Sequence, residues 1–135
     1  QTFFGEWTAG QVADHIIKAT KGLPDKHIAV AERPFNQHVD NLKKLFLDFS
    51  TKMNAPEFVH PVEGPFDSLH QLAAFQSNLE EHLDVIESKD LEEICLDFEV
   101  PFMGYLTRYE WLQFFVVHVL RHTNQLKNIY ADVHR

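Results

Sequence analysis

The chain has 135 residues, 44% of them hydrophobic and 24% charged, which is typical of a globular protein and enough to bury a core in one domain, 1–135. Its 12 Lys and Arg residues against 20 Asp and Glu residues give a formal net charge of −8, which opposes binding to a nucleic-acid backbone. No apolar run approaches the roughly 18 residues that a membrane span requires, and the single Cys95, which cannot form an internal disulfide, fits a reducing, cytoplasmic location.

The first predicted helix, 8–21, begins at a capping box. Thr8 can accept a hydrogen bond from the backbone three residues on, and Gln11 can reach back to the backbone of Thr8. Trp7 before the cap and Val12 after it form the matching hydrophobic staple. The pattern therefore predicts both where this helix starts and which face turns inward.

The next two helices are predicted from apolar residues spaced three or four apart. The second helix, 35–53, follows a stripe made of Phe35, Val39, Leu42, Leu45, Phe46, Phe49 and Met53. The third helix, 67–88, has Asp67 or Ser68 as its cap. Its stripe consists of Leu69, Leu72, Leu79, Leu83 and Ile86. Each stripe predicts the face that packs on the core.

The last predicted helix, 107–132, repeats the capping device with Thr107 and Glu110. Segment 90–106 before it suggests a short helix around "DLEEI" and an irregular end. No segment alternates as a strand would. The predicted fold is therefore all-α, an antiparallel four-helix bundle or something close to it.

The stretch "EWLQFFVVHVLRHTNQL", residues 110–126, is strongly apolar but contains two histidines. His118 and His122 lie about 40° apart around the helix, on its core-facing stripe. This spacing lets two ring nitrogens meet one metal ion at about 2.0–2.1 Å. The pair alone fits two hydrogen-bonded core histidines equally well, because the chain contains nine histidines and the spacing arises by chance.

A metal site would need a third ligand. His15 lies between Val12 and Ala19 at helical spacing, near the middle of its helix, and faces the core or its edge. His82 borders the stripe of the third helix and is the main rival. The other candidates lie in loops, at helix starts, off an apolar stripe or at the terminus: His27, His38, His60, His70 and His134. Geometry favours His15, keeps His82 as an alternative, and also allows for no third histidine.

The stretch "FGEWTAGQVADHI" near one end and "FMGYLTRYEWLQFFVVHVLRHTNQL" near the other together resemble the DinB/YfiT-like superfamily of metalloenzymes. In that family a Trp-led capped helix carries one histidine, and the final helix carries H-x-x-x-H. The lead-in G-x-L-T-x-x-E-W is similar to the DinB-like branch known as a domain of unknown function. The resemblance covers both ends of the chain and little of the middle. It implies His15, His118 and His122 as a three-histidine metal site inside a four-helix bundle.

One departure from the family concerns its first helix. A helix normally precedes the Trp-led segment, whereas six residues stand before Trp7 here. Either that helix is missing from this chain, or residues 35–53 supply the fourth helix by another route. A missing helix would favour a homodimer in which a second subunit covers the exposed groove.

The resemblance also implies a range of chemistry. Three imidazoles leave an open coordination position for zinc, nickel, manganese or iron, among which nitrogen ligands do not choose decisively. Family members include thiol-dependent S-transferases, an isomerase that uses a low-molecular-weight thiol, and metal-dependent hydrolases. The expected function is therefore a metal-dependent thiol S-transferase or hydrolase acting on a small molecule. The alternatives are a non-catalytic metal-binding, ligand-binding or dimerisation module, and a bundle whose histidines are only core residues.

Five further residues carry weaker signals. Gln125, one turn beyond His122, could hold a water or a ligand nitrogen, or be a polar residue at the edge of the stripe. Glu110 fits its capping box better than an acid or base role. Tyr105 and Phe102 fit packing better than a pocket mouth, and Cys95 fits a buried thiol better than a nucleophile.

Overall fold

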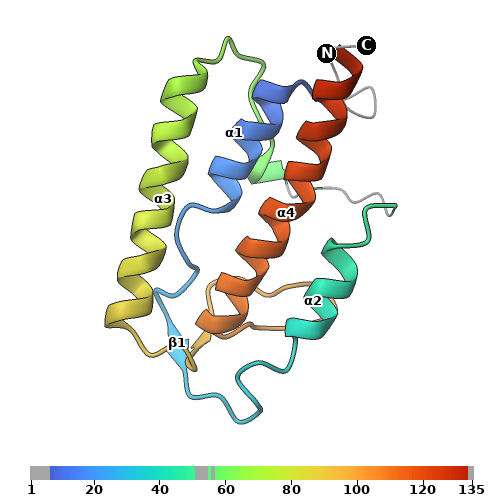
Figure 1. Ribbon diagram of the computed structural model, residues 1–135. Helices are drawn as coiled ribbons and strands as arrows, with labels where there is room; N and C mark the ends of the chain where they lie inside the picture. The colour runs from blue at the N-terminus through green and yellow to red at the C-terminus, as the bar shows by residue number, and fades with distance from the viewer. Residues whose placement is uncertain (1–6, 51–54, 56, 134–135) are drawn as a thin grey trace.

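The computed structural model describes residues 7–50, 55 and 57–133. Over these residues the chain is mostly helical, as predicted, with four α-helices and one two-stranded sheet (Figure 1). The elements follow the order α1 (Ala9–Ala19), β1 (Ile28–Ala29), α2 (Val39–Phe46), the short 3-10 helix η1 (Glu57–Val59), α3 (Ser68–Ser88), β2 (Ile94–Cys95) and α4 (Arg108–Val133). In Figure 1, α1 lies between α3 and α4, and it packs on both, while α2 packs on α4. None of the helices in the described part of the chain has the length and apolarity that crossing a bilayer demands.

Both predicted capping boxes are present. The Thr8 hydroxyl accepts from the Gln11 backbone at 3.2 Å, and the Gln11 side chain accepts from the Thr8 backbone at 3.0 Å. At α4 the same reciprocal pair joins Thr107 and Glu110, at 3.1 and 2.9 Å. Because each box satisfies backbone donors that a helix start leaves open, it sets the first residue of its helix. The first and last helices therefore begin where the sequence predicted.

The second helix is shorter than the predicted range 35–53, because α2 ends at Phe46. Contacts with the start of α4 prevent residues 35–38 from forming the first turn of the predicted helix. The Thr107 hydroxyl donates to the Phe35 carbonyl at 2.6 Å, and the backbone of His38 donates to Glu110 at 2.7 Å. These groups are unavailable for helical hydrogen bonds, so 35–38 form a turn. Of the predicted stripe, Val39 and Leu42 are buried, Phe46 is half-buried, Leu45 and Phe49 are exposed, and Met53 lies outside the described residues.

The predicted short helix around "DLEEI" is wrong. Residues 91–93 form a turn, and Ile94–Cys95 pairs antiparallel with Ile28–Ala29 as a two-stranded sheet. Two residues are too few to show an alternating pattern, so no strand could be predicted there. The buried thiol of Cys95 is part of the core, and burial raises its pKa to about 12. An inert buried cysteine is the outcome that the sequence favoured.

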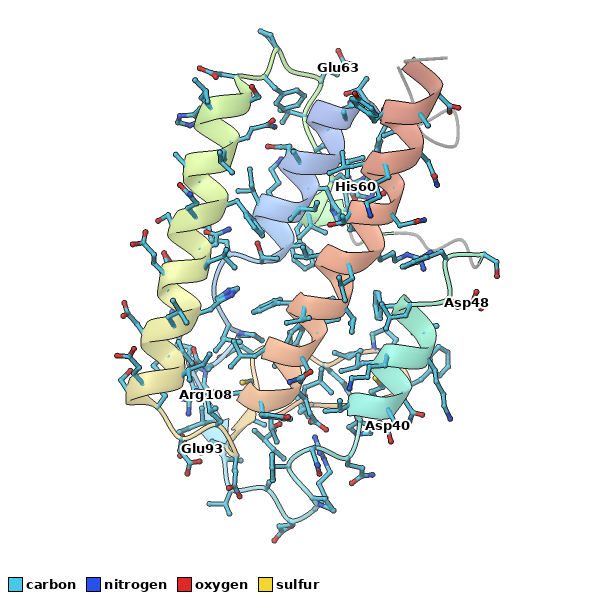
Figure 2. The ribbon with its side chains drawn as sticks, viewed as in Figure 1. Asp40, Asp48, His60, Glu63, Glu93 and Arg108 are labelled. Carbon is cyan, nitrogen blue, oxygen red and sulfur yellow. The ribbon has the colours of Figure 1, made fainter. Side chains whose placement is uncertain are left out.

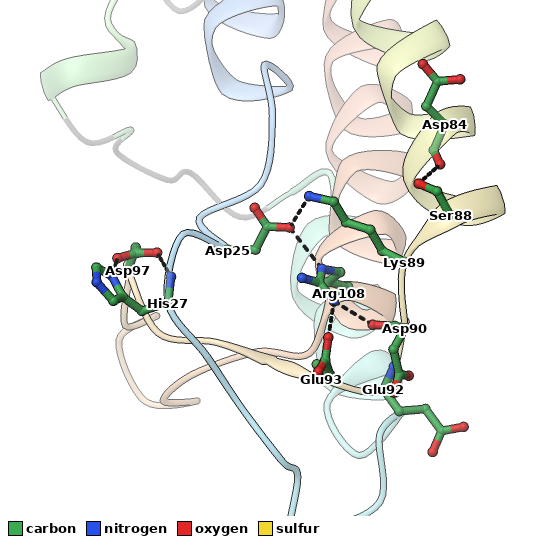
Figure 3. A network of polar contacts seen from close by, with 10 residues as sticks. All are labelled: Asp25, His27, Asp84, Ser88, Lys89, Asp90, Glu92, Glu93, Asp97 and Arg108. Carbon is green, nitrogen blue, oxygen red and sulfur yellow. Dashed lines mark hydrogen bonds and ion pairs between the residues drawn. The ribbon is translucent and has the colours of Figure 1, made fainter.

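A polar network ties the sheet end of the molecule together (Figure 3). Arg108, buried at the start of α4, donates to Asp25 at 2.9 Å and to Glu93. It also donates to the Asp90 carbonyl at 2.8 Å, while Lys89 reaches Asp25 at 3.0 Å. Burial would raise the pKa of Asp25, but the hydrogen bonds from Arg108 and Lys89 outweigh it and lower that pKa. The network joins the end of α3, the β2 segment, the start of α4 and the connection after α1.

The third helix has the predicted bounds, but the face that it turns toward the core is not the predicted one. Its leucine and isoleucine stripe faces solvent: Leu69, Leu72, Leu79, Leu83 and Ile86 are all exposed. The inward face carries Asn78 and His82, which are buried. Asn78 donates to the Ile17 carbonyl at 2.9 Å, and His82 donates to the Thr20 carbonyl at 2.7 Å. These acceptors end α1, and the last carbonyls of a helix need donors from outside it. The need for donors at this contact explains why the polar face turns inward.

The core consists of two apolar clusters along α4. One contains Leu42, Cys95, Leu106, Trp111 and Phe115. The other contains Val12, Ile16 and Ile129, with the half-buried Val119 and Leu126 against it. His118 and His122 lie between the two clusters along the same helix. The predicted core-facing position of this pair is therefore what the structure has.

Candidate metal centre

Three histidine side chains from the two ends of the chain meet between α1 and α4. The Nε2 atom of His118 lies 3.3 Å from that of His15 and 3.0 Å from that of His122. All three rings are buried, and one ring nitrogen from each lies within 4.8 Å of the others. The sequence predicted this proximity for His15, and the structure brings it together with both histidines of α4.

Two of the three rings are oriented through their other nitrogen. Nδ1–H of His15 donates to the Val59 carbonyl at 2.8 Å, and Nδ1–H of His122 donates to the Gln125 side-chain oxygen at 2.6 Å. These bonds place the protons on Nδ1 and leave lone pairs on both Nε2 atoms. The buried Nδ1 of His118 has no partner among the described residues. Its ring stacks on Phe114 instead, with centroids 5.0 Å apart.

Burial keeps the three imidazoles neutral. It lowers the pKa of His15 and holds that of His118 well below the ordinary value. It lowers the pKa of His122 to about 4. A charged ring would lose hydration in this environment, and for His118 the two neighbouring histidines would add repulsion. Neutral imidazole is also the form that ligates a metal.

The arrangement fits a single divalent ion. Two nitrogens that each lie about 2.0–2.1 Å from one ion are about 2.9 Å apart at a right angle and about 3.4 Å apart at the tetrahedral angle. Both observed Nε2 separations fall inside that interval. The donor set, three neutral nitrogens without a carboxylate, suits zinc, nickel, manganese or iron.

The rival histidine, His82, is not part of the cluster. Its ring nitrogen is occupied by the Thr20 carbonyl, and its ring stacks on Phe115 with centroids 4.6 Å apart. It is a satisfied core histidine that caps α1. Among the other candidates, His27 pairs with Asp97, and His70 is exposed. His38, expected to be solvated, is instead half-buried at the start of α2, and His134 lies outside the described residues.

A cavity of about 840 Å³ opens beside the three histidines. His60, which follows η1 and lies beside α1 in Figure 2, lines it together with Trp7. The Lys18 ammonium donates to the His60 carbonyl at 2.9 Å, and so fastens the segment after η1 to α1. Aromatic rings of α4 line the other side, among them Trp111 and Phe115. A cavity of this size, mostly apolar with a few convergent polar groups, is typical of a small-molecule site.

Four of the weaker sequence signals are resolved by these contacts. The side-chain oxygen of Gln125 accepts from Nδ1 of His122, the ring nitrogen that faces away from the other two histidines, which matches one of the two roles expected for it. Glu110 is fully buried and accepts from Arg33 through both oxygens, at 2.7 and 3.0 Å, so it is a structural anchor rather than an acid or base. Tyr105 and Phe102 are exposed and are not among the residues that line the cavity, so the packing role expected for them is wrong.

The sequence pattern does not indicate the groups that η1 and the residue after it bring to the histidines. The Val59 carbonyl, which orients His15, carries no side-chain signal. His60 has a sequence typical of a loop, and its neighbours do not indicate that this segment packs on α1. Trp7, predicted as a staple residue, also lies against the ring of His15, with centroids 5.0 Å apart.

Comparison with known proteins gives one match. A family model described as the DinB superfamily matches residues 2–126, most of the chain. No curated protein and no solved structure matches the chain significantly.

Proposed function

The chain belongs to the DinB superfamily, and from this premise we propose that His15, His118 and His122 bind one divalent transition metal in a metal-dependent enzyme of the thiol S-transferase or hydrolase kind. The observation that carries the proposal is the convergence of three buried histidines, in which Nε2 of His118 lies 3.3 Å from that of His15 and 3.0 Å from that of His122, both separations suited to one ion. In the same proposal, the helices form the antiparallel four-helix bundle of this family.

The residues around the three histidines orient the rings and form the walls of the site. The Val59 carbonyl and the Gln125 amide orient two of the rings, so that little has to move when a ligand binds. The ring of Phe114 stacks on that of His118 and covers one of its faces with apolar surface. When bound, a divalent ion with an open position supplies Lewis acidity and lowers the pKa of a coordinated water or thiol. The adjoining cavity then has room for the small molecule.

The test of the metal site is metal content. We expect near-stoichiometric zinc, nickel, manganese or iron in freshly purified protein, and its loss in His15→Ala, His118→Ala and His122→Ala. His82→Ala is the matched control, because it removes a buried histidine of the same core that lies outside the cluster. Circular dichroism checks that each variant keeps its helices. Retention of metal in the three variants, or its loss in His82→Ala alone, would contradict the proposed ligand set.

A second candidate function is a non-catalytic module that binds a metal or small ligand. It is favoured by the carboxylates of the described residues that line the cavity, because the one such acid, Asp97, already accepts two hydrogen bonds from His27. The two functions differ in turnover. An enzyme should transfer or hydrolyse a thiol-linked or ester substrate at a rate that His118→Ala abolishes, whereas a binding module should retain metal and show no such rate.

A further inference from the structure

The cavity beside the histidines continues as an aromatic pocket along α4. Phe115 and Trp111 lie one and two turns before His118, so aromatic surface extends from the histidines for about 10 Å. Phe98, from the loop after β2, lines the same cavity and contacts Trp111, with ring centroids 6.0 Å apart. This aromatic surface is much larger than a metal-bound water would need, and it can contact the apolar body of a larger ligand.

The charges that line the cavity have the opposite balance to those of the chain. The chain as a whole carries a net charge of −8. The described residues that line the cavity include Lys18, Lys21 and Arg121 but only one acid, Asp97. That carboxylate accepts from the backbone and the ring of His27, at 2.7 Å each. The hydrogen bonds from His27 lower the pKa of Asp97. Asp97 is therefore a carboxylate whose oxygens already accept hydrogen bonds from His27.

Of the three cations, Lys21 is the one available to a ligand. Lys18 pairs with Asp14 at 2.9 Å, and Arg121 donates to the backbone carbonyl of Asp48 at 2.9 Å. Lys21 makes no hydrogen bond or ion pair with the described residues, and it stands exposed just past the end of α1. An ammonium at the rim of an apolar cavity favours a ligand that brings a negative charge.

We propose that this cavity binds a small organic anion, a carboxylate with an aromatic or aliphatic body. The acidic group lies at Lys21, and the body lies against Phe98, Trp111 and Phe115. The proposal rests on the proposed function in one respect: three neutral imidazoles would leave the charge of a divalent ion uncompensated, which favours the same class of ligand. The lysine and the aromatic wall do not depend on the ion.

The test uses three probes and the chain's own fluorescence. Both tryptophans, Trp7 and Trp111, line the cavity, so ligand entry is read directly as a change in their emission. The probes are phenylbutyrate, the uncharged phenylbutanol of the same shape, and acetate, which has the charge without the body. We expect phenylbutyrate to bind about tenfold more tightly than either of the others. Equal or tighter binding of the alcohol would overturn the proposal.

Two charge reversals locate the anion. Lys21→Glu should weaken phenylbutyrate about tenfold and leave phenylbutanol unchanged. Lys127→Glu is the matched control, because it makes the same change of net charge at an exposed lysine of α4 that does not line the cavity. Equal weakening by both substitutions would show a general charge effect and contradict binding at Lys21. Phe98→Ala should weaken both phenyl probes by the same factor.

The titrations are run on zinc-loaded and on chelator-treated protein. Zinc content reports whether the metal site exists, and the ratio of the two phenyl-probe Kd values reports whether the cavity selects an anion. A protein that binds none of zinc, nickel, manganese and iron but prefers phenylbutyrate through Lys21 would overturn the proposed function alone. One that binds zinc without preferring the acid would overturn this inference alone.

Discussion

The two longest helices, α3 and α4, treat their apolar residues in opposite ways. In α4 the stripe from Trp111 to Ile129 is buried, and His118 and His122 are buried with it. In α3 the leucines point to solvent, while Asn78 and His82 are buried. Both helices therefore bury polar side chains, but only α4 buries them within an apolar stripe.

The difference lies in what each helix packs against. The buried polar groups of α3 meet the carbonyls at the end of α1, which need donors, and each finds an acceptor within 2.9 Å. The histidines of α4 meet another histidine, His15, and satisfy one another only in part. A buried polar residue with a backbone partner is structural, whereas a buried cluster of incompletely satisfied nitrogens is suited to binding a ligand.

The largest expected effect concerns the histidines of α4 in metal-free protein. The pKa of His122 is about 4 when folded and about 6.5 when unfolded. Between these values the unfolded state binds more protons, so stability falls as pH drops from about 6.5 and levels off below about 4. The loss from this residue is on the order of 3 kcal/mol. Urea unfolding at a series of pH values measures it, and His122→Gln should flatten the profile. An unchanged slope in that variant would contradict the assignment.

The next effect tests the buried charge at the start of α4. Arg108→Met removes a partner shared by Asp25 and Glu93. We expect a loss of about 2 kcal/mol of unfolding free energy, because Glu93 loses its ion pair and the partly buried Asp25 keeps only Lys89. Lys89→Met removes only an exposed partner of the same Asp25 and should cost less than about 1 kcal/mol. Equal losses measured by chemical denaturation would mean that burial of Arg108 contributes nothing.

A smaller effect tests the polar face of α3. Asn78→Ala leaves the Ile17 carbonyl and the Thr20 hydroxyl without their donor, and should cost roughly 1–2 kcal/mol. Thermal unfolding measures the change. Gln76→Ala, an exposed neighbour on the same helix, is the control and should have little effect. A neutral Asn78→Ala would show that capping of α1 does not decide the orientation of α3.

The smallest effect concerns the outward stripe of α3. Leu79→Gln and Leu83→Gln should each change the free energy of unfolding by no more than about 0.5 kcal/mol, because these side chains are exposed. The same change at the buried Leu42 should cost several times more. A large loss at Leu79 or Leu83 would show that the stripe is covered in solution and that the contrast between the two helices is smaller than the structure indicates.

The parts of the fold that follow from neighbouring residues were predictable. The capping boxes at Thr8 and Thr107 located two helix starts, since their partners are three residues away. The pairing of His118 with His122 followed from a spacing of four. The bounds of α2 were not predictable in this way, because Glu110 and Thr107, more than 70 residues away, take the hydrogen-bonding groups before it.

The sequence by itself determined the helices that bear histidines and the faces of α1 and α4 that turn inward. Both depend on short-range periodicity and on capping residues three positions apart, which packing does not change. Only the tertiary structure decided that His15 rather than His82 joins the pair on α4, that the leucines of α3 face outward, and that a carbonyl of η1 orients His15. These outcomes depend on which backbone groups lack partners once the helices pack, and no local pattern records that need.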